Sequence, residues 1–400
     1  MASLKVGVIF GGRSVEHDVS VVTAHQAMAA LAPDHEVIPV YVTREGKWLT
    51  GPGLNDLAVY RDKRWGSAGT PCFISPETGT GGLTVEPAAQ GGLLKRTRDV
   101  RYLPLDVVIP AIHGTFGEDG TLQGLLELAD IPYAGCNSLA SAVGMDKPAM
   151  KACFRDAGIA VLDHIVLHRD EILSDLGSTV EKVEDAIGYP AFAKPSRLGS
   201  SVGIGKAKDR ATLQEVLQVA ATYDRRILVE PSAEGCIEIN CSVLGGYGFQ
   251  ARASVCEQPV AWEEFLSFED KYMRGGKDGG TKDAQGMEAL DRRIPAPISD
   301  ELTTKVQELA VRAFESIDGA GVARVDCFVK QESGEVWVNE INTVPGSFAF
   351  YLWEHSGIDF GGLMQSLIDI ALAGHRQKQD LMFTYESGML DKDRGGSKRG

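Results

Sequence analysis

Residues 321–330, with the sequence GVARVDCFVK, and residues 335–342, with the sequence EVWVNEIN, are rich in β-branched and aromatic side chains. This composition is typical of strands, and the SGE turn between them predicts a hairpin. Side chains of the same parity along a strand point to the same face of a sheet. The polar side chains predicted to share one face of the hairpin are Arg324, Asp326, Glu340 and Asn342.

This predicted polar face has the chemistry of a metal site. Two carboxylates and a carboxamide offer oxygen ligands, which suit a hard cation such as Mg²⁺ or Mn²⁺ that keeps water and bridges phosphates. A guanidinium beside the metal would stabilise an anion that develops there. The alternative is a surface hairpin whose polar face is merely solvated. This segment alone leaves both interpretations open.

The composition bounds the class of protein. The chain has 400 residues, and the hydrophobic share of 44% is ordinary for a globular protein of two or three domains. The net charge of −15 argues against a general nucleic-acid or anionic-membrane surface, so we expect neither partner. Seven scattered cysteines without a CxxC pair indicate reduced thiols. Since no apolar run resembles a signal peptide or a membrane span, we expect a soluble cytoplasmic protein.

Residues 1–145 alternate strand and helix patterns, which predicts a Rossmann-like domain with a parallel sheet. KVGVIFGG is interpreted as a buried strand that ends in a glycine turn, and VSVVTAHQAMAAL as an amphipathic helix. HEVIPVYVT, DVVIPAIHG and IPYAG are interpreted as further strands. Residues 51–100 are rich in Gly, Pro and Thr and give weak signals, so we expect a peripheral insertion there.

The rest of the chain predicts two further domains and a tail. Residues 146–228 combine helices with short strands, as in a small α+β domain. Residues 229–375 contain the predicted hairpin and a long amphipathic helix in PISDELTTKVQELAVRAFESI, as in a mixed domain. Residues 376–400 end in a charged, glycine-rich sequence, which predicts disorder.

Three loops at predicted strand ends carry acidic or small residues. Glu16 precedes a helix, where a carboxylate either complements the helix dipole or binds the ammonium group of a substrate. The acidic pair in HGTFGEDGTLQG is best explained as helix-start residues. The loop KPSRLGSSVGIGK can place backbone N–H groups against phosphate oxygens, although a generic turn is also possible. Neither the Walker pattern nor the GxGxxG fingerprint is present.

Together, these segments resemble the D-alanine–D-alanine ligase family of the ATP-grasp superfamily. The resemblance runs from GGRSVEHDVS through HGTFGEDGTLQG, MDK, KPSRLGSSVG, EINCSVLG, EDKY and RVD to NEINTVPG, which is nearly the whole chain. It implies a three-domain ATP-grasp architecture, in α/β and α+β classes, with an N-terminal Rossmann-like domain. It also implies a ligase that joins two D-alanines for peptidoglycan synthesis through an acyl-phosphate intermediate. ATP would be the co-substrate, two Mg²⁺ or Mn²⁺ ions would be bound, and the protein would form a homodimer.

The resemblance implies roles for individual residues. ATP would be bound by Lys147, Lys194, Glu230, Glu238 and Lys271. The metal ions would be held by Asp326, Glu340 and Asn342. The first D-alanine would be bound by Glu16 and His113, with Ser200 and Tyr272 hydrogen-bonded to Glu16. The oxyanion would be stabilised by Arg324 and the backbone N–H of Gly346. The glycine-rich stretch 273–286 would be part of a lid that excludes water from the acyl phosphate.

Two departures from the family pattern concern the second substrate. Family members commonly carry a serine or threonine shortly after the Pro-Gly pair, whereas SFAFYLW follows here. Ser347 and Tyr351 are the candidates to replace it. The aromatic pair before EDKY is also reduced. The alternatives are therefore a sister ligase that uses D-lactate, D-serine or another amino acid, and an ATP-binding regulator without catalysis. The intact polar residues of the hairpin argue against a regulator without catalysis. The presence of Lys271 and Tyr272 argues against D-lactate as the acceptor.

Overall fold

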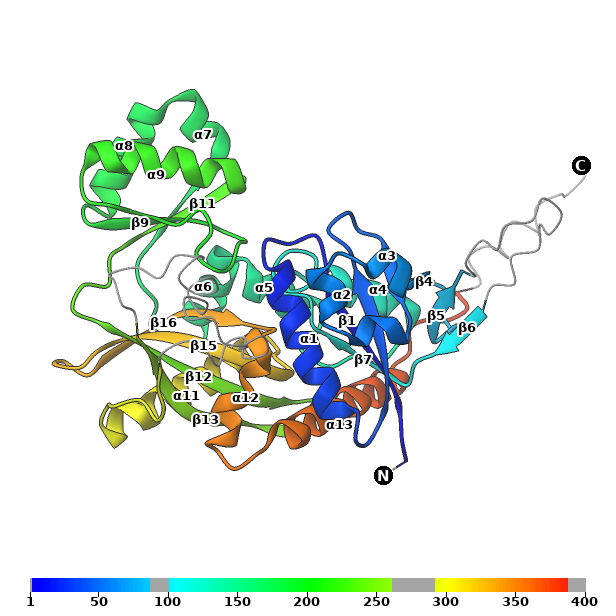
Figure 1. The fold of residues 1–400 in the computed structure, drawn as a ribbon. Coiled ribbons are helices and arrows are strands. Elements are labelled where there is room, and N and C mark those ends of the chain that lie inside the picture. Colours follow the sequence, from blue (N-terminus) through cyan, green and yellow to red (C-terminus); the bar gives the residue numbers. More distant parts are fainter. Residues whose placement is uncertain (1, 87–100, 261–291, 388–400) are drawn as a thin grey trace, which may run out of the picture.

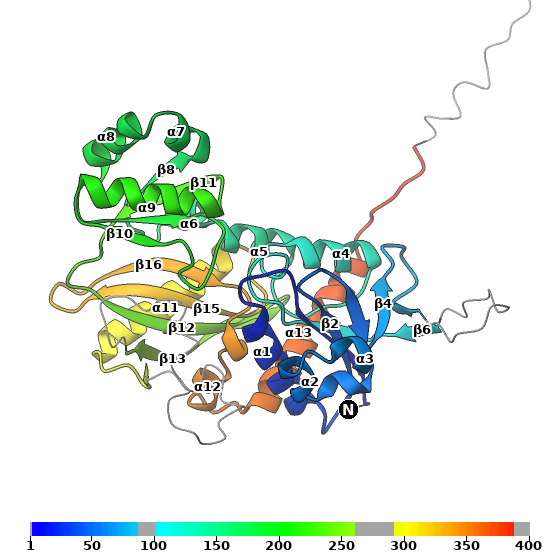
Figure 2. The same ribbon diagram turned by 45° about the horizontal axis from the view of Figure 1, so that its top comes forward.

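The computed structural model describes residues 2–86, 101–260 and 292–387, which form three β-sheets with helices packed on them (Figure 1). A seven-stranded sheet belongs to the N-terminal part, a four-stranded sheet to the middle of the chain, and a five-stranded sheet to the C-terminal part. Both views place the four-stranded sheet opposite the five-stranded sheet, with the N-terminal part beside the latter (Figure 2). The chain thus has the three structural units that the sequence predicts.

The N-terminal sheet has the strand order β6-β5-β4-β3-β2-β1-β7. Its centre is parallel, because β1 pairs in parallel with both β2 and β7, as the alternating pattern predicts. The strands are β1 (Lys5–Gly11), β2 (Glu36–Val42), β3 (Trp48–Thr50), β4 (Thr70–Ile74), β5 (Gly82–Val85), β6 (Arg101–Pro104) and β7 (Val107–Pro110). The helices of this part are α1 (His17–Leu31), η1 (Pro52–Asn55), α2 (Ala58–Arg61), α3 (Trp65–Ala68) and α4 (Thr121–Ala129).

Two details of this sheet differ from the sequence-based prediction. The segment expected to be a peripheral insertion contributes β4 and β5, which pair antiparallel and continue the sheet through β3. These strands are short and contain Thr, Pro and Gly, so their local strand propensity is weak. The segment IPYAG, predicted to be a strand, makes a single bridge from Tyr133 to Val108.

The central sheet has the order β10-β9-β11-β8, and all its pairings are antiparallel. The helices α7, α8 and α9 cover the face that is turned away from the C-terminal sheet (Figures 1 and 2). Helix α9 begins with a capping box in which Asp209 and Thr212 satisfy the first backbone N–H groups. The elements of this part are α5 (Ser138–Met145), α6 (Lys147–Asp156), β8 (Ile165–His168), α7 (Arg169–Ser174), α8 (Leu176–Ala186), β9 (Ala191–Pro195), β10 (Gly205–Ala207), α9 (Arg210–Tyr223) and β11 (Arg226–Pro231).

The C-terminal sheet has the order β14-β13-β12-β15-β16. One of its faces packs on the long helix α11, whose buried residues include Val306, Ala310 and Phe314. The elements are β12 (Ile237–Gly246), β13 (Phe249–Pro259), β14 (Arg292–Arg293), α11 (Asp300–Ser316), β15 (Gly321–Lys330), β16 (Glu335–Asn342), η4 (Gly346–Ala349), α12 (Phe350–Glu354) and α13 (Phe360–Gln379). Helix α13 thus continues past residue 375, where the sequence predicts the tail to begin.

The largest hydrophobic core joins the two ends of the chain. Val8 and Phe10 of β1 belong to the same buried cluster as Trp353 of α12 and Leu367 of α13. A ligand held between the N-terminal and C-terminal parts would therefore lie on a common rigid base. All seven cysteines are free thiols, as predicted. Within the described ranges, no helix is long and apolar enough to cross a membrane.

Candidate active site

The hairpin of β15 and β16 pairs in the register that brings its polar residues together. Arg324 lies opposite Asn342, and Asp326 lies opposite Glu340. The Arg324 Nε donates to Asp326 Oδ1 at 2.6 Å and its Nη2 donates to Oδ2 at 2.7 Å, while Asn342 Nδ2 donates to Oδ2 at 3.0 Å. Burial alone would lower the pKa of Arg324, but the adjacent Asp326 carboxylate more than offsets this and raises it well above its usual value. This guanidinium is therefore a permanent positive charge.

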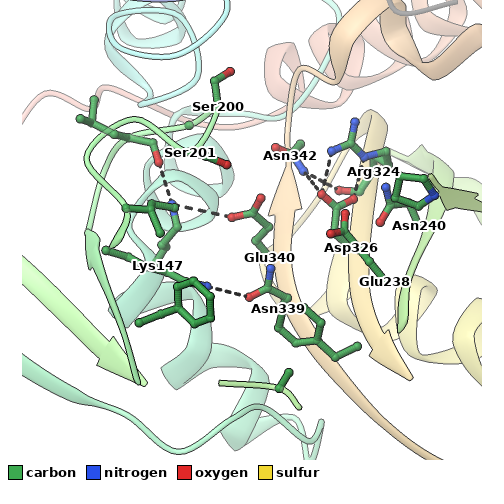
Figure 3. A pocket seen from close by; sticks show the side chains of 18 of the residues that line it. Lys147, Ser200, Ser201, Glu238, Asn240, Arg324, Asp326, Asn339, Glu340 and Asn342 are labelled. Carbon is green, nitrogen blue, oxygen red and sulfur yellow. Dashed lines mark hydrogen bonds and ion pairs between the residues drawn. The ribbon is translucent and has the colours of Figure 1, made fainter. Parts of the chain in front are cut away.

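Lys147 connects the hairpin to the small-residue loop that follows β9. It is the first residue of α6, and its Nζ donates to the Leu198 carbonyl at 2.7 Å and lies 3.7 Å from Glu340 Oε2. Figure 3 shows Lys147, Ser200 and Ser201 on one side of the site, Asp326 and Arg324 on the other, and Glu340 between them. Ser200 and Ser201 have φ values of 52° and 60°, a region that L-residues rarely occupy. Such backbone strain is typical of functional loops.

Glu16 lies where this loop meets the N-terminal part. It is buried, precedes α1, and accepts a short hydrogen bond from the Ser200 hydroxyl. A Cβ at Gly114 would lie 2.5 Å from Glu16 Oε2, and one at Gly199 would lie 3.0 Å from the same atom. Both glycines are thus needed for the backbone to approach this carboxylate.

His113 is fixed beside Glu16 by buried hydrogen bonds. Its Nδ1 donates to the Val344 carbonyl at 2.8 Å, and its Nε2 lies 2.8 Å from the Thr23 hydroxyl. Burial disfavours the charged form, but the hydrogen bond to Glu118 and its charge outweigh burial, so the pKa of His113 is raised. His113 therefore holds the segment before Gly346 against the N-terminal part.

A second buried charge cluster lies on the central sheet. Glu230 of β11 pairs closely with Lys194 of β9 and, at 2.9 Å, with Lys151 of α6. The Lys194 Nζ also lies 3.4 Å from Asn339 Oδ1. Lys151 is four residues after Lys147, so both lysines project from one face of α6. Lys151 and Asn339 were not among the predicted site residues, although the spacing of the two lysines on a predicted helix was a usable signal.

One cavity of about 570 Å³ brings these groups together between the central and C-terminal sheets. The predicted site residues that line it are Glu16, His113, Lys147, Lys194, Ser200, Glu230, Glu238, Arg324, Asp326, Glu340, Asn342 and Gly346. Ser347 and Tyr351 are described but do not line the cavity. Lys271, Tyr272 and the predicted lid at 273–286 lie outside the described residues.

The sequence matches family models over most of its length. The model described as D-ala D-ala ligase N-terminus covers residues 5–136, and the one described as D-ala D-ala ligase C-terminus covers residues 153–369. A D-alanine–D-alanine ligase of Bacillus cytotoxicus is 38% identical over 389 residues, which cover 96% of this chain and 100% of the relative. One of Acetivibrio thermocellus is 39% identical, over 92% of this chain and 96% of the relative. The chain belongs to the D-alanine–D-alanine ligase family.

Solved structures agree with this assignment. The D-alanine–D-alanine ligase of Coxiella burnetii superposes with a TM-score of 0.75 at 29% identity, covering 94% of this chain and 97% of that one. The VanG D-Ala:D-Ser ligase of Enterococcus faecalis has the same TM-score at 28% identity, covering 92% and 99%. The predicted ATP-grasp fold is thereby confirmed, and family membership makes the chain an ADP-forming ligase.

The ligase cavity also contains a polar cluster that the sequence analysis missed. Glu257 of β13 and Arg292 of β14 both line the cavity, and Arg292 Nη1 lies 3.3 Å from Glu257 Oε2. The Asn240 carboxamide also lies beside this pair, 3.5 Å from Glu257 Oε1. No local motif marks these residues, because Glu257 and Arg292 meet only through the pairing of β13 with β14.

Both carboxylates among the predicted metal ligands pair with protein cations. Asp326 pairs with Arg324, and Glu340 with Lys147. Among the described residues, no three His, Cys, Asp or Glu side chains gather into a metal site. The predicted ligands Asp326, Glu340 and Asn342 are not such a group, because one of the three is an amide. Its oxygen donors still fit a hard divalent cation, which would take over the neutralising role of the nearby lysine and arginine.

Proposed function

We propose that this chain joins two molecules of D-alanine to D-alanyl-D-alanine and converts one ATP to ADP and phosphate in doing so, for peptidoglycan synthesis. The observation that carries the proposal is a single cavity that combines three chemistries. The first is the Glu16 carboxylate, in a corner lined by glycines. The second is a pair of lysines suited to phosphates, Lys147 and Lys194. The third is the hairpin that carries the carboxylates and Arg324. An ATP-dependent ligase needs all three within one enclosed volume.

The nucleotide would lie between the central and C-terminal sheets. Lys147 and Lys194 would bind its phosphates, which explains why two ammonium groups face one cavity. We assign Glu230 to the vicinity of the adenine and Glu238 to the ribose hydroxyls. We also assign Lys271 to ATP binding.

Asp326, Glu340 and Asn342 would hold two divalent cations, Mg²⁺ or Mn²⁺. Support comes from their oxygen donors, and from the lysine and arginine that offset their charge in the present arrangement. When bound, the cations would neutralise charge on the phosphates during transfer. The protein's own contribution at this place is Arg324, whose positive charge is maintained by the adjacent Asp326 carboxylate.

The reaction would proceed in two steps. A carboxylate oxygen of the first D-alanine attacks the terminal phosphorus of ATP, the bond to ADP breaks, and an acyl phosphate forms. The free amine of the second D-alanine then attacks the acyl carbon, a C–N bond forms, and the C–O bond to phosphate breaks as a proton leaves the nitrogen. Arg324 and the N–H of Gly346 would stabilise the tetrahedral oxyanion between these events.

Glu16 would bind the ammonium group of the first D-alanine. The proposal is supported by its burial and by the hydrogen bond from Ser200, which holds one carboxylate oxygen in place. His113 would form part of the same corner. Tyr272 would complete the hydrogen-bond chain to Ser200 and close the site.

A different acceptor is the second candidate. The VanG neighbour is a D-Ala:D-Ser ligase, and the segment after Gly346 departs from the common family pattern. D-Serine, D-lactate or another amino acid would then replace the second D-alanine. We also propose a cytoplasmic location, since ATP is the co-substrate and the cysteines are free, and a homodimer by analogy with the family.

The test is ADP release in the presence of ATP, Mg²⁺ and a panel of D- and L-amino acids and D-hydroxy acids, with products identified by mass. The expected result is one ADP for each D-alanyl-D-alanine formed, with D-alanine alone sufficient. ADP release without a condensed product, or a product only with another acceptor, would contradict the proposal.

A further inference from the structure

The segment that follows Gly346 turns its polar side chains away from the cavity. Ser347, Phe348 and Ala349 have φ values of 52°, 54° and 52°, so the chain makes a left-handed turn that L-residues rarely adopt. The Ser347 hydroxyl donates to Gln26 Oε1 at 2.6 Å, and its backbone N–H donates to the Thr23 hydroxyl at 3.1 Å. Ser347 is therefore engaged with α1, and its side chain is not presented to a substrate in the cavity.

The same turn places Tyr351 beneath Arg292. The Arg292 guanidinium lies over the Tyr351 ring, with its central carbon 4.0 Å from the ring centroid. The Tyr351 hydroxyl donates to Glu257 Oε1 at 3.0 Å, and the other oxygen of Glu257 lies 3.3 Å from Arg292 Nη1. A stacked and paired guanidinium has a fixed orientation, which is what bidentate recognition of a carboxylate requires.

We propose that Arg292 is a specificity-determining residue that binds the carboxylate of the second substrate, and that Glu257 and Tyr351 are positioning residues for it. The inference rests on the proposed ligase function and names the acceptor class, an amino acid with a free carboxylate. Arg292 lines the same cavity as Arg324 and Gly346, so it is in the compartment where the amine must attack.

The two arginines have different ion-pair partners, which supports different roles in the site. Arg324 is paired through two nitrogens with Asp326, on the face proposed to hold the metal ions. Arg292 is paired with Glu257, which is not one of the proposed metal ligands. A carboxylate bound by Arg292 would therefore not compete with the metal ligands.

The test uses a probe that keeps the amine and lacks the carboxylate. D-Alaninamide can act as acceptor but not as donor. The purified full-length enzyme is given ATP, Mg²⁺, D-alanine and D-alaninamide together, and the ratio of D-alanyl-D-alanine to D-alanyl-D-alaninamide is measured by mass. We expect wild type to favour D-alanine strongly, and Arg292→Met to reduce this preference roughly tenfold to a hundredfold, as for loss of a charge-assisted hydrogen bond.

A matched control is available on the same strand. Arg293 neighbours Arg292 and is exposed, so Arg293→Met makes the same change of charge and should leave the ratio unchanged. An unchanged ratio in Arg292→Met would overturn the inference. If that variant does not fold, Arg292→Lys decides, because it keeps the charge but not the planar fork: a reduced preference supports the inference, and a wild-type ratio overturns it.

Two further variants separate positioning from general packing. Tyr351→Phe keeps the ring under Arg292 but removes the hydroxyl that donates to Glu257, so it should raise the acceptor KM several-fold and leave the ATP KM unchanged. Ser347→Ala should leave the acceptor KM unchanged. If Ser347→Ala raises the acceptor KM and Tyr351→Phe does not, Ser347 rather than Arg292 binds the acceptor carboxylate. If wild type forms no condensed product from D-alanine, the proposed function itself fails, which this assay distinguishes from failure of the inference.

Discussion

The two sides of the cavity are built in different ways. On one side, Arg324, Asp326 and Asn342 form a sheet wall, whose side-chain hydrogen bonds join residues of one β-hairpin (Figure 3). On the other side, Lys147, Ser200 and Glu16 form a loop wall, assembled from three separate segments whose contacts join distant parts of the chain.

The difference in construction suggests a difference in role. Two directly paired strands hold charges at fixed positions, which suits stabilisation of a transition state. A glycine-rich and serine-rich loop with strained backbone angles can open and reclose, which suits capture of a substrate. We therefore expect changes in the sheet wall to reduce kcat, and changes in the loop wall to raise the KM of the first amino acid.

The largest effect is expected for Glu340→Gln on β16, which extends the sheet wall. The change removes a charge at a proposed metal ligand with little change in volume. Loss of such stabilisation costs about 3–4 kcal/mol, so kcat should fall several-hundredfold while thermal stability is nearly unchanged. Glu335→Gln on the same strand is exposed and is the control. Near-wild-type turnover at saturating Mg²⁺ would remove Glu340 from the metal site.

The next largest effect concerns Glu230, which belongs to neither wall. Burial by itself would raise the pKa of Glu230, but Lys194 and Lys151 outweigh it and lower the pKa from 4.5 to about 2. A depressed carboxyl pKa stabilises the folded state above pH 4.5, and this stabilisation is lost as the pH falls toward 2. Its size is on the order of 3 kcal/mol.

Glu230→Gln should therefore destabilise the protein most near pH 7, and the difference from wild type should shrink as the pH falls below 4.5. The measurement is denaturant unfolding of both proteins across this range. A difference that is independent of pH would show that the ion pairs with the two lysines do not account for the stabilisation.

A smaller effect is expected for Glu16→Gln in the loop wall. The amide replaces a charge-assisted contact with an ammonium group, which costs about 1.5–3 kcal/mol. The KM of the first amino acid should rise by roughly tenfold to a hundredfold, with little change in the KM of ATP. Equal increases in both constants would instead indicate that Glu16 only supports the start of α1.

Ser200→Ala should have the smallest effect. It removes the hydroxyl that donates to Glu16 and leaves the carboxylate in place, so a loss of about 1 kcal/mol is expected. Because the two residues act together, adding Ser200→Ala to Glu16→Gln should cost less than Ser200→Ala alone. Strict additivity of the two changes in KM would contradict their coupling in the loop wall.

The parts of the fold that the sequence predicted are those with a strong local pattern. The strand β1, the helices α6 and α11, and the β15–β16 hairpin each have a periodicity that only one secondary structure satisfies. The strands β4 and β5 were missed because their short Thr-, Pro- and Gly-containing sequences are stabilised by pairing with neighbours, which no local pattern reveals.

The candidate site likewise contains residues that a local sequence pattern predicts and residues that only distant contacts bring together. The sheet wall was predicted from parity along two strands, whereas the pairing of Glu257 with Arg292 required a contact between residues far apart in sequence. Residue type alone does not distinguish a buried lysine from a solvated one, so only its spacing from Lys147 on the predicted helix could have indicated Lys151. Ser347 and Tyr351 were selected for their position after Pro-Gly, but the left-handed turn at 347–349 cannot be foreseen from residues that rarely adopt it.

The central claim is that the cavity activates a carboxylate as an acyl phosphate before an amine attacks. The most direct test uses D-alanine with ¹⁸O in its carboxylate and measures the label in the products by mass. The account predicts that one labelled oxygen is transferred to each released inorganic phosphate and that the new peptide carbonyl keeps the other donor oxygen. Unlabelled phosphate, or label in a nucleotide product, would contradict it.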